Sequence, residues 1–260
     1  MEAQEARELV LQALPNFASA GLPTVEAEAI VDVQVSHLAS LWAGMGQVYR
    51  LTVRSEGTAP VAIVAKRVQL PKQCSSIGDQ RKKDSYAVEA AFYMCGHALR
   101  CLAAGAVVPH PLHVAAERGD GVTICMTQLE GTASHRDASR AFCVWLARFH
   151  ATYWGARADE ACGPSERGGL QSQGCYWHLD TRRDEHRRMG NQGWMGRLKL
   201  AAAAIDQRLK ADPMQSVLHG DAKGANIVYG SGPDGSAVAR VYDFQCACVQ
   251  DLQCLTERQA

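Results

Sequence analysis

The sequence predicts an α+β protein with two lobes, a β-rich first part followed by a mainly helical second part. Short apolar runs of the β-strand type, separated by glycine-containing turns, dominate residues 41–129. Apolar residues at helical spacing dominate residues 138–211. After them comes HGDAKGAN, residues 219–226, in which an imidazole, a carboxylate, an ammonium and a carboxamide are separated only by small residues. Such a loop suits a small-molecule site in a cleft between two lobes.

Length and composition limit the classes of protein that come into question. The chain has 260 residues, of which 47% are hydrophobic and 21% charged. Its 27 basic and 27 acidic side chains give a formal net charge of zero. This is an ordinary globular composition for one large domain or two lobes. Because there is no basic excess, we expect neither a nucleic acid nor a membrane surface as a partner.

The N-terminus and the cysteines predict a cytoplasmic protein. Residues 1–14 read as an amphipathic helix, because charges interrupt the apolar run that a secretory signal needs. No apolar stretch is long enough to span a membrane. The ten cysteines show neither a CxxC pair nor zinc-finger spacing, so we expect free thiols in a reducing compartment. They are Cys74, Cys95, Cys101, Cys125, Cys143, Cys162, Cys175, Cys246, Cys248 and Cys254.

Four strands and one helix are expected in the first part. A GMG turn precedes a strand over residues 47–53, and an EGTAP turn joins this strand to the apolar run VAIVAKRV, residues 61–68, in a hairpin. Residues 111–129 form two more short strands around a GDG turn. Between the two pairs, residues 84–104 are expected to form one helix that stops at Gly105.

The second part is expected to be mainly helical. A helix over residues 138–154 carries its apolar side chains on one face. Residues 155–174, which are rich in glycine, serine and charge, are expected to be irregular, and the charge run 181–189 to be a solvated helix face. A further helix over residues 193–211 stops before a proline. Short apolar runs in SVLHGD and in VARVYDF predict strands that flank the polar loop.

The polar loop and a second aspartate supply side chains that suit phosphoryl transfer. If IVYG and ARVYDF form a hairpin, Asn226 and Asp243 meet at its open end. Their oxygen atoms are ligands of the kind that hold Mg²⁺ together with phosphates. Asp221 would then accept the proton of an attacking hydroxyl. The ammonium of Lys223 would lie near the transferred phosphoryl group, where it would offset negative charge.

The β-rich part offers groups that suit a nucleotide. Lys66 ends the apolar run VAIVAK, where a lysine is unusual, and it is placed to pair with phosphates. Glu89 lies among apolar neighbours in the following helix, and a buried glutamate needs a partner such as Lys66. Gly44 and Gly46 form a flexible turn that could cover phosphates. Together these groups predict a nucleotide on the β-rich side of the cleft.

The motifs HGDxxxxN, residues 219–226, and DFQ, residues 243–245, resemble those of the aminoglycoside phosphotransferase and choline kinase superfamily, which shares the protein-kinase-like fold. The stretches SYAVEAAFY, HGDAKGANIVY and VYDFQ are similar to its ecdysteroid-kinase-like (CHK kinase-like) branch. The resemblance covers residues 41–245. It implies a two-lobed kinase-like fold, ATP and Mg²⁺ as cofactors, and a hydroxyl of a small molecule as the phosphoryl acceptor.

The resemblance also implies a role for each candidate residue. The catalytic aspartate would be Asp221, and an ion pair of Lys66 and Glu89 would orient the nucleotide. A hinge near Met126 to Leu129 would receive the adenine. The predicted site residues are His219, Asp221 and Lys223 for catalysis, Asn226 and Asp243 for the metal, and Gly44, Gly46, Lys66, Glu89, Met126, Gln128 and Leu129 for the nucleotide.

Simpler alternatives exist for several of these residues. His219 is expected to brace the loop through backbone hydrogen bonds rather than to act as a base. Lys223 is either a phosphate ligand or a solvated loop lysine. Lys66 and Glu89 alternatively form a purely structural ion pair. A protein kinase is disfavoured, because Gln245 stands where protein kinases usually carry glycine.

Further expectations concern the boundary between the two lobes and the segment that follows Asp243. We expect a nucleotide-binding lobe over residues 1–128 and a helical lobe with the catalytic loop over residues 129–260. Relatives continue well beyond the second aspartate, whereas seventeen residues follow Asp243. The helical lobe is therefore expected to be incomplete. An inactive nucleotide-binding protein with the kinase fold, or a truncated isoform, is the alternative function. The acceptor and the oligomeric state cannot be read from the sequence.

Overall fold

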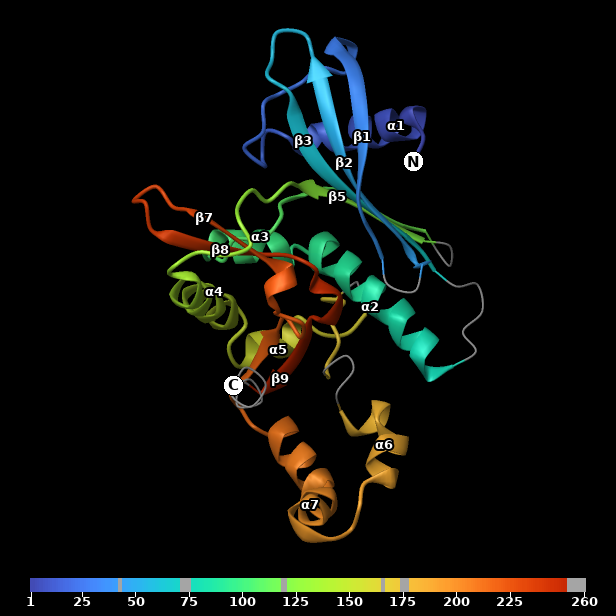
Figure 1. Cartoon of the computed structure of the whole chain (residues 1–260), viewed down its shortest axis with the longest axis vertical. Helices are drawn as coiled ribbons and strands as arrows, with labels where there is room; N and C mark the ends of the chain where they lie inside the picture. Colours follow the sequence, from blue (N-terminus) through green and yellow to red (C-terminus); the bar gives the residue numbers. More distant parts are fainter. Residues whose placement is uncertain (42–43, 71–75, 118–120, 165–166, 174–177, 252–260) are drawn as a thin grey trace.

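The computed structural model describes residues 1–41, 44–70, 76–117, 121–164, 167–173 and 178–251 (Figure 1). Its first part is an antiparallel sheet in the order β1-β2-β3-β5-β4. The strands are β1 (Ile30–Ser40), β2 (Gly46–Ser55), β3 (Val61–Gln69), β4 (Pro111–Glu117) and β5 (Gly121–Thr127). Both predicted hairpins, β2–β3 and β4–β5, are therefore confirmed. The GDG turn between β4 and β5 falls largely on residues 118–120, outside the described residues.

Strand β1 was not anticipated from the sequence. It pairs with β2 along its length, yet only Ile30 and Val33 among its side chains are buried. Its register with β2 shifts between Ile30 and Asp32 and again between His37 and Ala39. Such irregularities interrupt the strict alternation of faces along a strand. The pattern by which a half-buried strand is recognised is therefore weak here.

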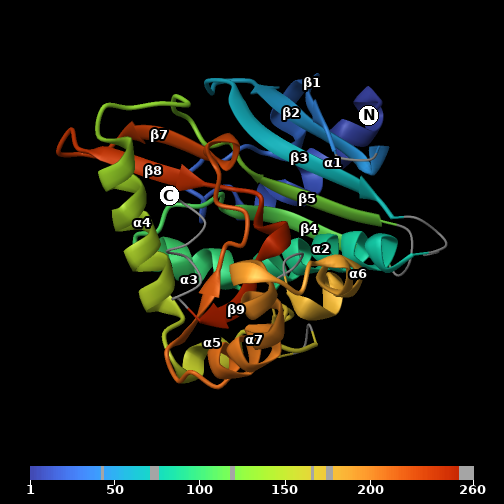
Figure 2. The ribbon, with the colours of Figure 1, turned by 60° about the horizontal axis from the view of Figure 1, so that its bottom comes forward.

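Two helices cover opposite faces of the sheet (Figure 2). The side chains of β3 point alternately toward one helix and toward the other. Ile63 and Ala65 pack in the cluster that contains α1 (Ala3–Ala13), the predicted N-terminal helix. Val68 packs in the cluster that contains α2 (Ile77–Met94). Lys66 lies two residues from Val68, so its side chain points to the same face as Val68. The centre of the sheet thus directs one charged side chain toward α2.

The prediction of a single helix over residues 84–104 is wrong, because the structure has two helices there. Helix α2 begins earlier, at Ile77, where the Ser76 hydroxyl accepts a hydrogen bond from the Asp79 backbone N–H (3.1 Å). It is followed by α3 (His97–Ala103). Gly96 separates the two helices with a left-handed φ of 79°, a conformation that ends helices at little cost for glycine. The predicted stop at Gly105 is confirmed, with a φ of 77°.

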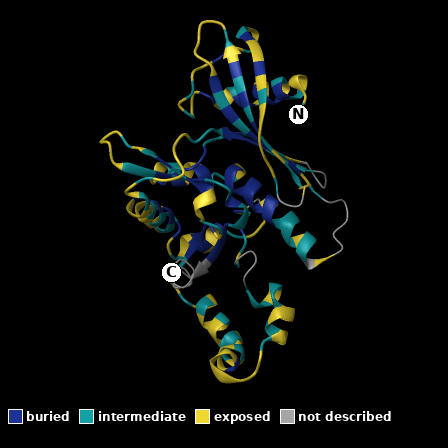
Figure 3. Cartoon of the chain, in the orientation of Figure 1, coloured by how far each residue is buried: buried dark blue, intermediate teal, exposed yellow. Residues whose placement is uncertain are grey.

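The second part is mainly helical, as predicted, so the α+β class is confirmed. Its helices are α4 (Ala138–Thr152), α5 (Ala156–Glu160), α6 (Arg183–Arg188) and α7 (Gly193–Lys210). Helix α5 falls in the segment 155–174, so the expectation of an irregular segment was wrong at that point. Helices α6 and α7 lie at the end of the molecule opposite the sheet (Figure 1), and both are largely half-buried or exposed (Figure 3).

Two short antiparallel pairs complete the structure. Strand β6 (Gln215–Leu218) pairs with β9 (Cys248–Asp251), and β7 (Ile227–Ser231) pairs with β8 (Ala237–Val241). Strands β6 and β8 were predicted, and β7–β8 is the hairpin expected between the polar loop and Asp243. Strand β9 was not predicted. Because β6 leads directly into residues 219–226, its pairing with β9 holds the start of the polar loop.

One apolar core joins the sheet to the helical part. Ile124 on β5 belongs to the same buried cluster as Phe92 on α2 and as Trp145 and Phe149 on α4. The indole N–H of Trp145 also donates to the Val107 carbonyl, just before β4 (2.9 Å). Since a shared core resists relative movement of its walls, the sheet and the helices hold the site between them in a defined geometry.

The structure bears on two predictions, the absence of a membrane-spanning segment and the presence of free thiols. No described helix combines the length and the apolar character that crossing a membrane requires. Within the described residues, Cys101, Cys125, Cys143 and Cys162 are free thiols. Burial raises the pKa of Cys101 and of Cys125 to about 12, so these two thiols stay protonated and unreactive. Cys74, Cys175 and Cys254 lie outside the described residues.

Candidate active site

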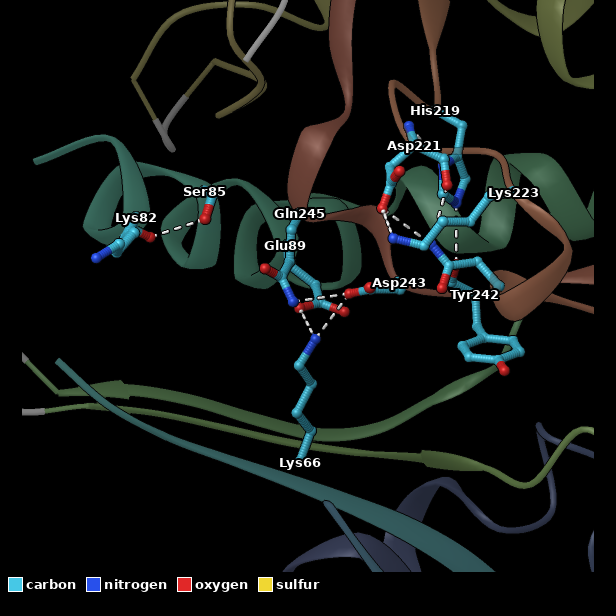
Figure 4. Close-up of polar contacts among 11 residues, drawn as sticks. Lys66, Lys82, Ser85, Glu89, His219, Asp221, Lys223, Tyr242, Asp243 and Gln245 are labelled. Carbon is cyan, nitrogen blue, oxygen red and sulfur yellow. Dashed lines mark hydrogen bonds and ion pairs between the residues drawn. The ribbon is translucent and has the colours of Figure 1, made fainter. Parts of the chain in front are cut away.

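Lys66 projects from the centre of the sheet into the space beside α2 (Figure 4). In the register of the sheet it lies opposite Val48 on β2 and Ile124 on β5. Its side chain is 6% exposed, so its ammonium has lost most of its contact with water. A buried ammonium requires acidic or hydrogen-bonding partners, and the fold supplies two of them.

Glu89 and Asp243 are these partners. The Lys66 Nζ donates to Glu89 Oε2 on α2 (2.5 Å) and to Asp243 Oδ1, two residues after β8 (2.9 Å). The Nζ also lies 5.7 Å from the centre of the Tyr86 ring. One lysine therefore ties the sheet, α2 and the segment after β8 together. The predicted partnership of Lys66 with a buried glutamate is confirmed as a contact.

The charges of this cluster follow from burial and proximity. Burial lowers the pKa of Lys66, but Glu89 and Asp243 outweigh this effect and raise the pKa above its ordinary value of 10.5. Burial raises the pKa of Glu89 to about 7, against the opposing effect of Lys66. For Asp243 the effect of burial is outweighed by Lys66, which holds the pKa below its ordinary value. The cluster is thus net negative once Glu89 ionises.

Asp243 has an unusual backbone conformation. Its φ of 70° and ψ of 67° are left-handed, and it is the one residue other than glycine with a positive φ among the residues that the structure describes. For an aspartate this conformation costs about 1–2 kcal/mol. The next residue, Phe244, is completely buried, and its ring stacks on that of Phe92 of α2. The strained turn therefore aims Asp243 at Lys66 while it anchors Phe244 in the core.

His219 braces the polar loop from inside. Its Nε2 lies 2.9 Å from the Tyr242 carbonyl, and its Nδ1 accepts a hydrogen bond from the Asp221 backbone N–H (3.3 Å). These contacts require a neutral ring that carries its proton on Nε2. Burial lowers the pKa of His219, which favours this neutral form. The ring thus links the backbone of the polar loop to that of the segment that carries Asp243.

Asp221, Lys223 and Asn226 form a hydrogen-bonded group within the polar loop. Asp221 Oδ2 accepts hydrogen bonds from Lys223 Nζ (2.7 Å) and from Asn226 Nδ2 (3.3 Å). Asn226 Nδ2 also donates to the Asp221 backbone carbonyl (2.9 Å), which closes the loop. Asn226 is buried, whereas the Asp221 and Lys223 side chains are 38% and 59% exposed. The acidic and basic side chains of the loop therefore face solvent on a fixed base.

The β7–β8 hairpin carries Asn226 and Asp243, the two predicted metal ligands, on the backbone at its open end. Ile227 pairs with Val241, and the Tyr242 backbone N–H donates to the Asn226 carbonyl (3.1 Å). Asn226 therefore lies opposite the residue that precedes Asp243. The prediction that this hairpin places Asn226 and Asp243 at its open end is confirmed. The Tyr242 hydroxyl, which donates to the Ala225 carbonyl (2.6 Å), adds a further bond across this end.

Gly44 and Gly46 lie where β1 turns into β2. Gly46 has a φ of 140°, and a Cβ atom there would collide with the Arg67 carbonyl oxygen on β3. Gly44 has a φ of 70°, and apart from its chain neighbours no described residue has an atom within 4 Å of its Cβ position. Since Val48 lies opposite Lys66, this turn is at the Lys66 end of the strands. Residues 42–43 of the same turn lie outside the described residues.

The predicted hinge begins within β5, at Met126, and continues beyond the end of this strand to Leu129. Met126 is buried on β5, on the same face as Ile124 and hence on the face of Lys66. Gln128 and Leu129 come just after the strand and are half-buried. The Oε1 of Gln128 is buried without a hydrogen-bond partner among the described residues. The predicted hinge thus begins on the strand next to β3, on the face of the sheet that carries Lys66.

Two contacts in the site were missed from the sequence. Gln245 Nε2 donates to Asp243 Oδ1 (2.8 Å), the same oxygen that Lys66 binds. The Phe244–Phe92 stack was also missed. The only signal in the sequence was the position of Gln245 after Asp243 and Phe244, where protein kinases carry glycine. A cavity of about 640 Å³ lies elsewhere, between α6, α7 and β9, and no predicted site residue lines it.

The chain belongs to the phosphotransferase enzyme family, whose sequence profile matches residues 80–254. This match contains Glu89, the polar loop and Asp243, and it confirms the superfamily that the sequence motifs predicted. The chain is therefore a phosphotransferase by family. No curated protein matches it.

Three solved structures are among those that resemble the chain. An aminoglycoside-3'-phosphotransferase of type VIII has 16% identity over 92% of this chain and 79% of its own, with a TM-score of 0.47. A protein described as a fructosamine-3-kinase from Haemophilus somnus 129PT has 14% identity over 93% of this chain and 72% of its own, with a TM-score of 0.47. A thermostable mutant of an aminoglycoside phosphotransferase has 12% identity over 85% of this chain and 70% of its own, with a TM-score of 0.46.

Proposed function

We propose that the protein is an ATP- and Mg²⁺-dependent phosphotransferase that transfers the γ-phosphoryl group to a hydroxyl of a small molecule. The observation that carries the proposal is the buried cluster in which Lys66 binds both Glu89 and Asp243, next to a loop that exposes Asp221. Phosphoryl transfer needs mainly positioned charges of this kind. Membership of the phosphotransferase enzyme family supports the same reaction class.

The nucleotide would bind between the sheet and the polar loop. Lys66, held by Glu89, would contact the α- and β-phosphates, and the turn with Gly44 and Gly46 would cover them. The adenine would lie against the hinge at Met126, Gln128 and Leu129. The buried Oε1 of Gln128, which has no partner among the described residues, is an acceptor available in this region. In this arrangement the nucleotide-binding lobe would comprise residues 1–128 and the catalytic lobe residues 129–260.

The available oxygen atoms suit a magnesium ion. The amide nitrogen of Asn226 is committed to Asp221, so its Oδ1 remains for a ligand. Asp243 Oδ1 is taken by Lys66 and Gln245, and within the described ranges no hydrogen bond to its Oδ2 occurs. In the described part of the chain, no three or more His, Cys, Asp or Glu side chains form a group that could hold a metal ion by themselves. One carboxylate and one carboxamide, with phosphates and water, are a common magnesium shell.

The chain's own groups would then perform the transfer. Asp221 would orient the acceptor hydroxyl and take its proton, while the acceptor oxygen bonds to the γ-phosphorus and the bond to the β-phosphate oxygen breaks. Lys223 would leave Asp221 and neutralise charge on the transferred group. Bound magnesium would supply neutralisation of the phosphate charge. His219 would act only by bracing the loop, as its two backbone contacts favour.

Branch, acceptor and compartment belong to the same proposal. SYAVEAAFY, HGDAKGANIVY and VYDFQ favour the ecdysteroid-kinase-like branch. The similar structures are described as aminoglycoside and fructosamine kinases, so we propose a small-molecule alcohol as the acceptor without choosing among these classes. Free thiols at Cys101, Cys125, Cys143 and Cys162 favour a reducing compartment, and we propose the cytoplasm.

Replacing Asp221 with asparagine tests the proposal, because it keeps the shape of the side chain but removes its basicity. Formation of ADP would be followed with Mg²⁺-ATP over a panel of amino sugars, amino alcohols, sugars and sterols. Asp221→Asn should lower kcat roughly 10²–10⁴-fold with ATP affinity retained. Asp180→Asn, on an exposed residue that pairs with Arg183, is the matched control. Undiminished transfer by Asp221→Asn refutes the role of Asp221, and ATP binding without turnover favours an inactive binding protein.

A further inference from the structure

Gln245 lies in the site, but the proposed reaction assigns it no role. It is half-buried, follows the anchored Phe244, and points back toward Asp243 (Figure 4). Its amide Nε2 donates to Asp243 Oδ1 at 2.8 Å, and Lys66 Nζ donates to that same oxygen at 2.9 Å. The carboxylate of Asp243 is therefore held on one side by two different donors.

Because both donors bind the same oxygen, the two oxygens of the Asp243 carboxylate differ in their hydrogen bonds. Oδ1 accepts both hydrogen bonds, whereas Oδ2 accepts none from the residues that the structure describes. The Asp243 side chain is 28% exposed, so it remains accessible to a ligand. A single bond from Lys66 would let the carboxylate rotate about that bond. A second donor, from the other end of the same turn, removes this freedom.

The chemistry of Gln245 suits this task better than that of a charged residue. A second cation beside Lys66 would cancel the net negative charge of the cluster and weaken the attraction for a metal. A carboxylate would repel Asp243. The neutral amide supplies a donor without changing the charge. The left-handed backbone of Asp243, fixed by Phe244 on Phe92, brings the side chain of Gln245 back over Asp243.

We propose that Gln245 is a positioning residue that orients Asp243, so that Oδ1 stays with the protein and Oδ2 is presented to the divalent cation of the nucleotide complex. This inference rests on the proposed function, because it assumes that Asp243 binds a cation together with ATP. It adds that the glutamine of the DFQ motif sets the coupling between metal and nucleotide. Gln245 touches neither substrate nor metal and acts through Asp243 alone.

The coupling can be measured without turnover. Calorimetry would give the Kd of a non-hydrolysable ATP analogue in EDTA and in saturating Mg²⁺, and the ratio of the two values is the gain due to the metal. Gln245→Met keeps the length of the side chain but removes the donor. It should bind the analogue in EDTA as the wild type does, while the gain from Mg²⁺ falls about tenfold or more.

Two further variants complete the experiment. Gln245→Leu lacks the donor with a different shape and should lose the same gain, and unchanged affinity in EDTA reports that each variant is folded. Gln69→Met, on an exposed glutamine at the end of β3, should keep the full gain. Equal gains in wild type and Gln245→Met overturn the inference and leave the proposed function intact. No metal-dependent gain in the wild type overturns both.

Discussion

Phe244 lies parallel to Phe92, with their ring planes 6° apart and their ring centres 3.7 Å apart. Phe244 follows Asp243, and Phe92 lies one helical turn beyond Glu89 on α2. The stack therefore fixes the distance between the two carboxylates that Lys66 holds. Around it, Trp145, Phe149 and His219 surround Phe244 with centroid separations of 6.5 Å or less. An apolar contact thus sets the geometry of a polar cluster.

Phe244→Ala should remove this support. A cavity in place of a completely buried ring should lower the free energy of unfolding by about 3–5 kcal/mol, measured by urea denaturation. Affinity for a non-hydrolysable ATP analogue should fall as well, because Asp243 loses its anchor. Phe142→Ala on α4, where the ring is only half-buried, is the control and should cost clearly less. Equal losses in both variants would contradict the special position of Phe244.

Lys66→Met should destabilise the protein and abolish nucleotide binding. It leaves Glu89 and Asp243 without their shared cation, and removal of one partner from a buried ion pair costs about 3–5 kcal/mol. Unfolding by urea and calorimetry with the ATP analogue are the measurements. Arg67→Met, on the neighbouring residue whose pair with Glu5 is exposed, should change stability by less than about 1 kcal/mol. A Lys66→Met variant with wild-type stability would refute the buried cluster.

Gly46→Ala should destabilise the turn between β1 and β2. A Cβ atom there would collide with the Arg67 carbonyl, and the φ of 140° is strained for alanine. Gly44→Ala also has a positive φ but meets no atom of the described residues beyond its chain neighbours within 4 Å, so it isolates the effect of the collision. Gly46→Ala should cost roughly 2 kcal/mol more than Gly44→Ala in urea denaturation. Indistinguishable variants would argue against the close β2–β3 approach.

His150→Leu should change how stability depends on pH. Burial lowers the pKa of His150 from 6.5 to about 4, and its Nε2 has no hydrogen-bond partner among the described residues. Between these values the unfolded chain binds the proton and the folded protein does not. The stability that the wild type has above pH 6.5 is therefore lost as the pH falls toward 4. This single group contributes about 3 kcal/mol to the change.

His150→Leu has no imidazole at this position and therefore does not lose this stability at low pH. The difference in unfolding free energy between wild type and His150→Leu should therefore shift in favour of the variant as the pH is lowered from 7 to 4.5, measured by urea denaturation at each pH. His37→Leu, on an exposed residue of β1, is the control for the substitution itself. Parallel pH profiles for wild type and His150→Leu would contradict the burial of a neutral imidazole.

Much of the fold could be predicted because local patterns were strong. The hairpins followed from apolar runs between glycine-containing turns, and α4 and α7 followed from their apolar spacing. The break at Gly96 was missed because the apolar spacing continues on both sides of it. Strands β1 and β9 were missed because β1 buries only Ile30 and Val33, and β9 is four residues long and pairs with the distant β6.

Some contacts of the site could likewise be predicted from the sequence, and others could not. Lys66 in an apolar strand and Glu89 in an apolar helix conflict with their surroundings, and this conflict indicated their pairing. The contact of Gln245 with Asp243 could not be predicted, because it depends on the left-handed backbone of Asp243. The roles of the site residues and the boundary at residue 128 stay predictions until they are measured.

Lys66 joins residues that are far apart in the chain, since Asp243 follows it by 177 positions. During synthesis the five strands of the sheet, the last of which ends at Thr127, are made long before residue 243. The third member of the cluster arrives only after residue 243 has left the ribosome, and contacts of such long range form late in folding. Under the proposed function, competence to bind a nucleotide therefore requires that residue 243 has already been synthesised. Under the same proposal, a nascent chain that has the complete sheet but lacks Asp243 would not bind ATP.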